Sequence, residues 1–126
     1  MFRAKLFGGF LFALFLAGPV LAVELVMVEQ TGCAWCARWN EEIAPAYPNT
    51  DEGQFAPLRR VDLRNMPDDL EIARRVTFTP TFLLVEDGRE IARLEGYPGE
   101  DFFWPLLDRI LIEHTNYAPA GPEGNG

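Results

Sequence analysis

QTGCAWC, residues 30–36, holds both cysteines of the chain and separates a predicted strand from a predicted helix. The apolar, β-branched residues 23–29 predict the strand, and the helical residues that follow end before Pro45. This order puts Cys33 at the helix N-terminus, where its sulfur faces unpaired backbone N–H groups and the positive end of the helix dipole. Both effects favour the thiolate, so the sequence predicts a reactive cysteine at this position.

Cys33 and Cys36 could instead form a structural bridge or bind a metal. A bridge around two intervening residues constrains the unfolded chain very little. A structural zinc site needs four ligands, and His114 is the one other soft candidate. Covalent haem attachment needs a histidine directly after the second cysteine, where this chain has Ala37. The pattern therefore favours a redox dithiol, in which Cys33 attacks a partner's disulfide and Cys36 resolves the mixed disulfide.

The rest of the chain predicts three more strands and two more helices. Residues 58–63, 81–86 and 89–95 are strand candidates, and Asp87-Gly88 is typical of a tight hairpin turn between the last two. Pro67-Asp68-Asp69 favours the start of a short helix that reaches about residue 75, whereas 49–54 reads as a polar loop.

A last helix is indicated by apolar side chains at helical spacing, with Pro105 expected in its first turn. The side chains of this stripe are Phe103, Leu106, Leu107, Ile110 and Leu111.

The predicted order of elements is β-α-β-α-β-β-α. A strand-helix-strand start requires a right-handed crossover and a parallel pair, and the hairpin adds an antiparallel pair. The expected fold is an α/β domain with a four-stranded mixed sheet flanked by helices on both faces. This domain spans 23–114, and the Gly- and Pro-rich tail at 115–126 is expected to be disordered.

The aromatic residues divide into an exposed tryptophan and a larger buried set. Trp35 lies inside the cysteine motif and is expected to be exposed beside Cys33, where it can form part of a partner-binding surface. The set expected in the core consists of Trp39, Phe78, Phe82, Phe102, Phe103 and Trp104.

Residues 1–22 have the build of a secretory signal peptide. A short positive start precedes a dozen apolar residues at 6–17, and small or medium residues follow at 20–22. The apolar run is short for a bilayer span, which needs ~20 residues. The sequence predicts cleavage near Val23 and export to an oxidising compartment such as the bacterial periplasm; the alternative is an uncleaved inner-membrane anchor at 6–17.

Charge excludes one class of partner. The 126 residues carry 11 basic and 19 acidic side chains, a net charge of −8. Without residues 1–22, the remaining 104 residues carry 9 basic and 19 acidic side chains and no lysine. A surface this acidic repels phosphate backbones, so we expect no binding to nucleic acid.

These motifs together resemble the thioredoxin family, over nearly all of residues 23–113. The shared features are the C-x-x-C after the first strand, Thr79-Pro80-Thr81-Phe82 at the third strand, the Asp87-Gly88 hairpin, and Gly96 after the fourth strand. The resemblance implies a thiol–disulfide oxidoreductase whose dithiol needs no added cofactor. It also implies a cis peptide bond before Pro80, which would face Cys33, and a Thr79 backbone that pairs with a bound partner.

The chain departs from the family pattern at three places. Met27 stands where members of the family often have a buried acid, six positions before the first cysteine. Glu29 is the nearest acid on that strand, either as a proton shuttle or as a solvated edge charge. Ala34-Trp35 replaces the Gly-Pro pair of cytosolic thioredoxins. These residues influence the redox potential, so the potential of cytosolic thioredoxins cannot be assigned to this chain. The family's extra N-terminal strand and helix have no room here.

The resemblance implies a dedicated reductase. Oxidase-type relatives insert a helical domain before the proline, and isomerase-type relatives carry a dimerisation module; this chain has space for neither. The architecture is similar to small exported thioredoxins that serve sulfur-oxidation or cytochrome c maturation systems. We therefore expect a monomer that reduces a disulfide or modified cysteine on a protein partner and is kept reduced by a membrane electron donor protein.

The alternative function is a redox-inert binding module, such as a Cu(I)-handling or chaperone-like protein. Cysteine thiolates are soft ligands that can hold Cu(I). Met27 and Met66 are the methionines available as further ligands in such a module.

Overall fold

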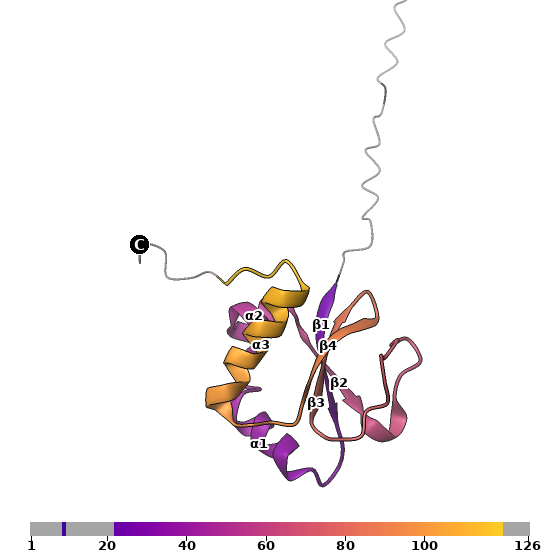
Figure 1. Cartoon of the computed structure of the whole chain (residues 1–126), viewed down its shortest axis with the longest axis vertical. Helices are drawn as coiled ribbons and strands as arrows, with labels where there is room; N and C mark the ends of the chain where they lie inside the picture. The colour runs from indigo at the N-terminus through magenta and orange to yellow at the C-terminus, as the bar shows by residue number, and fades with distance from the viewer. Residues whose placement is uncertain (1–8, 10–21, 120–126) are drawn as a thin grey trace, which may run out of the picture.

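The computed structural model describes residue 9 and residues 22–119 (Figure 1). The predicted signal peptide thus lies outside the described residues, apart from Gly9 and Ala22. None of the described helices has the length and apolar character needed to cross a bilayer. The elements are β1 (Val23–Glu29), α1 (Ala34–Glu42), the 3-10 turn η1 (Tyr47–Asn49), α2 (Asp51–Phe55), β2 (Leu58–Asp62), the 3-10 turn η2 (Leu63–Asn65), β3 (Thr81–Glu86), β4 (Arg89–Glu95) and α3 (Glu100–His114).

The sheet is four-stranded and mixed, as predicted, and its strands lie in the order β2-β1-β3-β4. β1 pairs with β2 in parallel and with β3 antiparallel, and β3 pairs with β4 antiparallel. The unbroken apolar run at residues 25–28 of β1 suits this central position, since the strand is covered on both faces. Because Val28 pairs with Thr81, the end of β1 and the start of β3 meet at one edge of the sheet.

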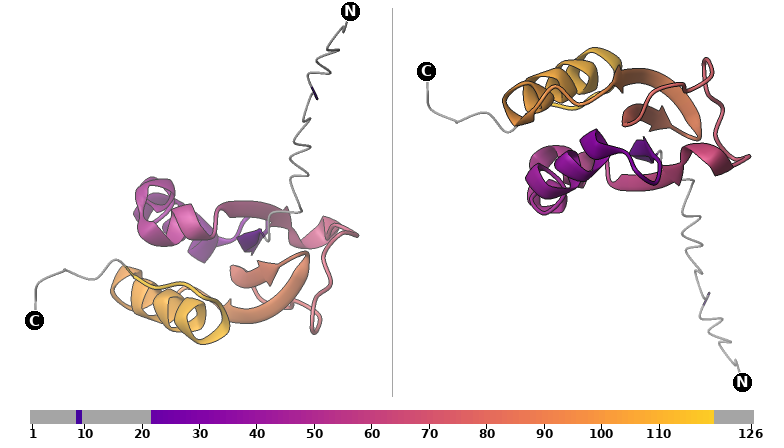
Figure 2. Two further views of the ribbon diagram at one scale, coloured as in Figure 1. Left: turned by 90° about the horizontal axis from the view of Figure 1, so that it is seen from above. Right: turned by 90° about the horizontal axis from the view of Figure 1, so that it is seen from below.

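All three α-helices contribute to the core on one face of this sheet, as Figure 2 shows from two directions. Trp39 from α1 contacts Phe82 from β3 at a ring distance of 5.1 Å, and Phe103 from α3 lies 5.1 Å from the same ring. These three predicted core residues are fully or almost fully buried. They join the helical layer to the central strands.

The second face is covered without an α-helix, so the predicted helix at 67–75 and the prediction of helices on both faces were wrong. The segment runs irregularly, and Leu70 and Ile72 alternate toward the sheet with a period of two. Glu71 donates its backbone N–H to the Gly88 carbonyl at 2.7 Å, and its carbonyl accepts from the N–H of Glu90 at 2.9 Å. Pairing with the free edge of β4 thus satisfies backbone groups that a helix would have satisfied internally.

The helix before β2 was predicted as a loop. Residues 51–55 form α2, and the Thr50 side chain caps it by accepting the N–H of Gly53 at 3.0 Å. A threonine followed by two acidic residues is a helix-start pattern, because the side chain and the charges compensate the free N–H groups.

α3 is longer than predicted and contains Pro105 in its interior, not in its first turn. Gly99, with φ of 103°, precedes it, and Glu100 and Asp101 supply acidic side chains to the first turn. These acids interact favourably with the helix dipole. This stabilisation helps to offset the hydrogen bond that is lost because proline has no backbone N–H.

The start of the C-terminal tail packs against the domain through Tyr117. Tyr117 is buried, and its ring lies 5.1 Å from that of Phe55. Thr115 donates its hydroxyl to the Leu111 carbonyl at 2.5 Å and so continues the end of α3. Residues 120–126 lie outside the described part of the chain.

A carboxylate pair lies where α2, α3 and the tail meet. Burial first, and then the hydrogen bond and negative charge of Glu52, raise the pKa of Asp108 to about 7. The buried Oδ1 of Asp108 and the buried hydroxyl of Tyr117 have no hydrogen-bond partner among the described residues. Burial and the charge of Glu52 also raise the pKa of Tyr117 to about 12. Ionised Asp108 is therefore unfavourable in the folded protein.

We expect Asp108→Asn to stabilise the protein more at pH 8 than at pH 5. The folded state holds the Asp108 proton more tightly than the unfolded state, whose aspartate pKa is about 3.9, so wild-type stability falls as pH rises toward 7. Thermal unfolding between pH 5 and pH 8 measures the effect, which should reach a few degrees at the alkaline end. Asp68→Asn, at an exposed aspartate, is the matched control. A difference that is the same at every pH would contradict the expectation.

Candidate active site

Cys33 lies at the N-terminus of α1, as predicted. The chain leaves β1 at Glu29 and turns through Gly32, whose φ of 81° favours glycine. Cys33 is the N-cap of α1, and its Sγ accepts the backbone N–H of Cys36 at 3.1 Å. The two cysteines form a disulfide. In the reduced protein the same N–H would stabilise a thiolate at Cys33.

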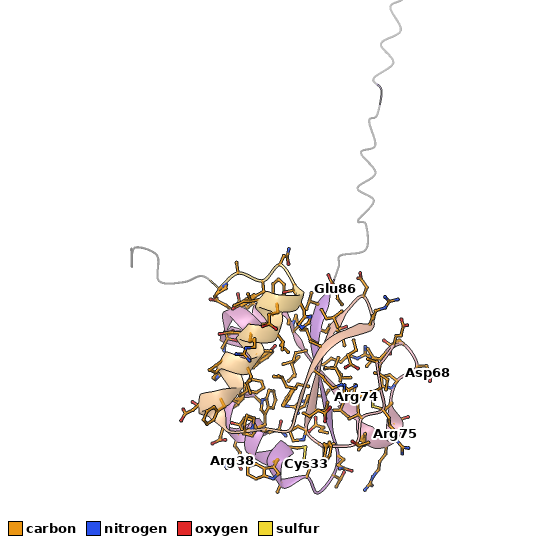
Figure 3. All side chains as sticks on the ribbon, viewed as in Figure 1. Cys33, Arg38, Asp68, Arg74, Arg75 and Glu86 are labelled. Carbon is orange, nitrogen blue, oxygen red and sulfur yellow. A yellow bond between two sulfur atoms is a disulfide. The ribbon has the colours of Figure 1, made fainter. Side chains whose placement is uncertain are left out.

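The two sulfurs differ in their access to solvent. Cys33 is half-buried, whereas Cys36 is 3% exposed and belongs to the core beneath α1. A partner's sulfur can therefore approach Cys33 and not Cys36. Figure 3 shows Cys33 and Arg38 at one end of the molecule and Glu86 at the other.

The loop before β3 lies beside this motif. The Thr79–Pro80 peptide bond is cis, and Pro80 is buried. Gln30, in the turn before Cys33, donates its side-chain N–H to the Thr79 hydroxyl at 2.8 Å. On the other side, Gly96 donates its N–H to the Pro80 carbonyl at 2.8 Å. The loop is thus held between the cysteine turn and the end of β4.

An open groove of about 510 Å³ runs along the loop. It is lined by Trp35, Phe78, Thr79, Glu95, Gly96 and Tyr97. The structure therefore brings Trp35 and Thr79 together from distant parts of the sequence, while Pro80 is buried and is not among the lining residues.

Phe78 was wrongly predicted to be in the core. It is 61% exposed, and Trp35 is 53% exposed, as expected for a residue beside Cys33. The Thr81 hydroxyl binds the Phe78 carbonyl at 2.7 Å, which holds the residue at the groove. Phe102, also predicted in the core, is 64% exposed in the first turn of α3, and Trp104 is half-buried and stacks on Tyr47.

A second cavity, of about 410 Å³, touches both cysteines and includes Glu29 and Asn40 in its lining. Arg60 from β2 binds both of these side chains, Glu29 at 2.8 Å and Asn40 at 2.9 Å. Glu29 is therefore an ion-paired residue of the site and not a solvated edge charge.

Arg60 also lies against Met27, the residue that stands where members of the family often have a buried acid. Its Nη1 lies 3.6 Å from the Met27 sulfur, and its guanidinium lies 5.9 Å from the centre of the Trp39 ring. Sequence reasoning did not single out Arg60, because its role depends on the parallel pairing of Met27 with Arg60. A prediction of the β1–β2 register would have identified Arg60, since residues paired across two strands are neighbours.

The soft ligands do not converge on the cysteines. Met27 is buried in the same core as Cys36, but Met66 lies against the core on the other face of the sheet. Among the residues that the structure describes, no three His, Cys, Asp or Glu side chains form a group that could hold a metal.

Comparison with known proteins identifies the family. The family model described as the thioredoxin-like domain matches residues 23–111. The chain belongs to the thioredoxin-like domain family. Among solved structures, it is similar to the reduced form of the periplasmic thioredoxin SoxS from Paracoccus pantotrophus, with 58% identity and a TM-score of 0.70. That match covers 72% of this chain and 97% of the other.

No curated protein sequence matches this thioredoxin-like chain. The family, the solved relative and the Cys33–Cys36 disulfide together make the protein a thiol–disulfide oxidoreductase. The fold and the family predicted from the sequence are thereby confirmed.

We expect the reduced protein to have one thiol with a lowered pKa, at Cys33, and one thiol that reacts slowly, at Cys36. In the Cys36→Ser variant, the rate at which iodoacetamide alkylates Cys33 is followed by mass spectrometry as a function of pH. This rate should rise around a pKa within about 3.5–7.5, and not around the value of about 8.5 of a free cysteine. In Cys33→Ser, the buried Cys36 should react far more slowly. An inflection of Cys33 near the free value would contradict the expectation, and tight Cu(I) binding in the same protein would favour the binding module.

Proposed function

We propose that the protein works in the periplasm as a reductase for a disulfide or modified cysteine on a partner protein, in a sulfur-oxidation or cytochrome c maturation system. The observation that carries this proposal is the half-buried Cys33 beside an open groove, with Cys36 buried behind it. The similarity to a periplasmic thioredoxin over 97% of that chain supports the compartment, as does the signal peptide that the sequence predicts at 1–22.

The reaction proceeds in two exchanges. The Cys33 thiolate attacks one sulfur of the partner's disulfide, so that a bond forms between Cys33 and the partner while the partner's second sulfur leaves as a thiolate. The thiolate of Cys36 then attacks the Cys33 sulfur and releases the first partner sulfur. The partner gains two electrons and two protons, and the Cys33–Cys36 disulfide forms. A membrane electron donor protein returns two electrons to this disulfide.

The groove recognises the partner by backbone pairing and apolar contact. Within residues 22–119, no hydrogen bond uses the backbone N–H or carbonyl of Thr79. An extended partner segment can satisfy these groups as a short added strand. Trp35, Phe78 and Tyr97 offer apolar surface to side chains beside the partner's cysteine. The protein binds this partner as a monomer and, with its acidic surface, binds no nucleic acid.

Glu29 serves the second exchange. Cys36 must lose its proton before it attacks, and burial leaves it little access to water. Glu29 is the one carboxylate in the lining of the cavity that touches both cysteines, and Arg60 holds it there. We assign it the role of proton acceptor for Cys36, acting across the cavity.

We expect Glu29→Gln to slow the second exchange at pH 7 by about a hundredfold, the lower end of what a general base contributes. Mixing reduced protein with dithiobis(nitrobenzoate) should give two absorbance phases, the first from attack by Cys33 and the second from attack by Cys36. The variant should change the second phase only, and alkaline pH should restore it. Glu24→Gln, at the other end of β1, is the matched control. Equal slowing of both phases would refute the role.

We expect Cys36→Ser to accumulate mixed disulfides with the partner in cells, whereas Cys33→Ser should accumulate none. Without Cys36 the first exchange still occurs but cannot be resolved. Non-reducing electrophoresis and mass spectrometry of the trapped species identify the partner and its cysteine. If the two variants trap equally, the assignment of Cys33 as nucleophile fails.

A further inference from the structure

A buried ion pair lies on β4, on the far side of the sheet from the helices. Arg93 donates from Nε and from Nη2 to the two carboxylate oxygens of Glu90, each at 2.6 Å. The side chains are 7% and 4% exposed. Of the ion pairs within residues 22–119, this is the one in which both partners are buried.

An irregularity in the strand makes the pair possible. Residues three apart on a regular strand point to opposite faces. In β4, however, Glu90 pairs with Val85 and Ala92 pairs with Leu84, so Ile91 is an extra residue. This bulge turns Glu90 and Arg93 to the same face, where the irregular segment that covers the second core lies.

Both partners bind the backbone of that segment. Glu90 Oε1 accepts the N–H of Ala73 at 2.9 Å, and Arg93 Nη2 donates to the carbonyl of Arg74 at 2.8 Å. Burial acts to raise the pKa of Glu90, but the hydrogen bonds from Arg93 and Ala73 outweigh it and hold that pKa below its usual range. The pair is therefore charged at neutral pH.

The same network reaches the groove. Arg74 binds Glu95, which lines the groove, and Arg93 Nη1 lies 3.8 Å from the same carboxylate. Four residues after Arg74, the chain enters the loop of Phe78, Thr79 and Pro80. The pair thus fixes the backbone just before the loop and also one wall of the groove.

Stability alone does not account for this arrangement. A buried ion pair is often no more stabilising than apolar residues of the same volume, because desolvation offsets the attraction. The exposed pairs Arg59–Asp69 and Arg89–Glu71 also fasten the segment, but exposed pairs contribute little. What the buried pair adds is a defined geometry for a segment that has no helix of its own.

We propose that Glu90 and Arg93 are positioning residues that hold the Phe78–Thr79–Pro80 loop in the geometry that binds the partner's backbone. The proposal rests on the function proposed above, since it assigns the loop to partner binding. The pair touches neither cysteine, so it acts on recognition and not on the reactivity of the sulfurs.

The test compares two probes with one reporter group. The first is dithiobis(nitrobenzoate), which is small and makes no strand pairing. The second is an eight-residue peptide whose cysteine is a mixed disulfide with thionitrobenzoate. Cys33 attacks the peptide sulfur of the second probe, or either sulfur of the symmetric first probe; the S–S bond breaks, Cys33 is joined to the attacked sulfur, and the other sulfur leaves as the coloured thionitrobenzoate thiolate. We expect Arg93→Met to lower the second-order rate with the peptide by about tenfold, the equivalent of one backbone hydrogen bond, and to leave the small-probe rate within about twofold.

Arg93→Lys keeps the proposal testable if Arg93→Met fails to fold. Lysine keeps the buried charge but cannot make both bonds to Glu90 and the bond to Arg74, so a smaller loss in the same direction is expected. Arg109→Met, at an exposed arginine on α3, is the control for loss of an arginine. Amide hydrogen exchange of the folded variants should accelerate in residues 73–80 and stay unchanged in α1.

The outcomes are distinct. If the second-order rate of a folded variant falls equally with both probes, or is unchanged with both, the positioning role is refuted. If the wild-type protein reacts with neither probe, the proposed function itself fails, whatever the variants do. A selective loss with the peptide, together with faster exchange in residues 73–80, supports the assignment.

Discussion

The pairing of Val28 with Thr81 is the constraint from which the active site follows. It aligns the end of β1 with the start of β3, so the turn that carries Cys33 and the loop that carries Thr79 leave the sheet at the same edge. The Gln30 side chain then has only to span this edge to reach the Thr79 hydroxyl. β1 is hydrogen-bonded on both sides and contributes buried residues to both faces, so the end of this central strand fixes where the cysteine turn begins.

The two faces of the sheet perform different tasks. The helical face buries Cys36 and leaves Cys33 accessible, which sets the order of the two exchanges. Within residues 22–119 the other face has no α-helix, and an irregular segment both helps to cover it and leads to Thr79 at the groove. An irregular segment must find partners for its backbone outside itself, so charged side chains of β4 take over what a helix would do internally.

Sequence reasoning succeeded where local chemistry decides and failed where tertiary contacts decide. Cys33 at a helix N-terminus and the hairpin between β3 and β4 follow from residue types within a few positions of one another. The helix predicted at 67–75 rested on equally local signals, but pairing with the β4 edge prevailed. Phe78 was predicted in the core because phenylalanine usually is, and its exposure follows from the loop it precedes. Tyr117 shows the converse, since a Gly- and Pro-rich tail holds one aromatic residue that packs into the core of the domain beside Phe55.

Charge near the cysteines is balanced within the protein, although the protein as a whole is strongly acidic. Glu29 is paired with Arg60, and Glu95 with Arg74, so each of the two cavities has its carboxylate neutralised by an arginine from another segment. An unpaired carboxylate beside Cys33 would oppose its thiolate, because like charges at short range disfavour ionisation. Pairing with Arg60 and Arg74 thus allows Glu29 and Glu95 to lie at the site with less opposition to a Cys33 thiolate.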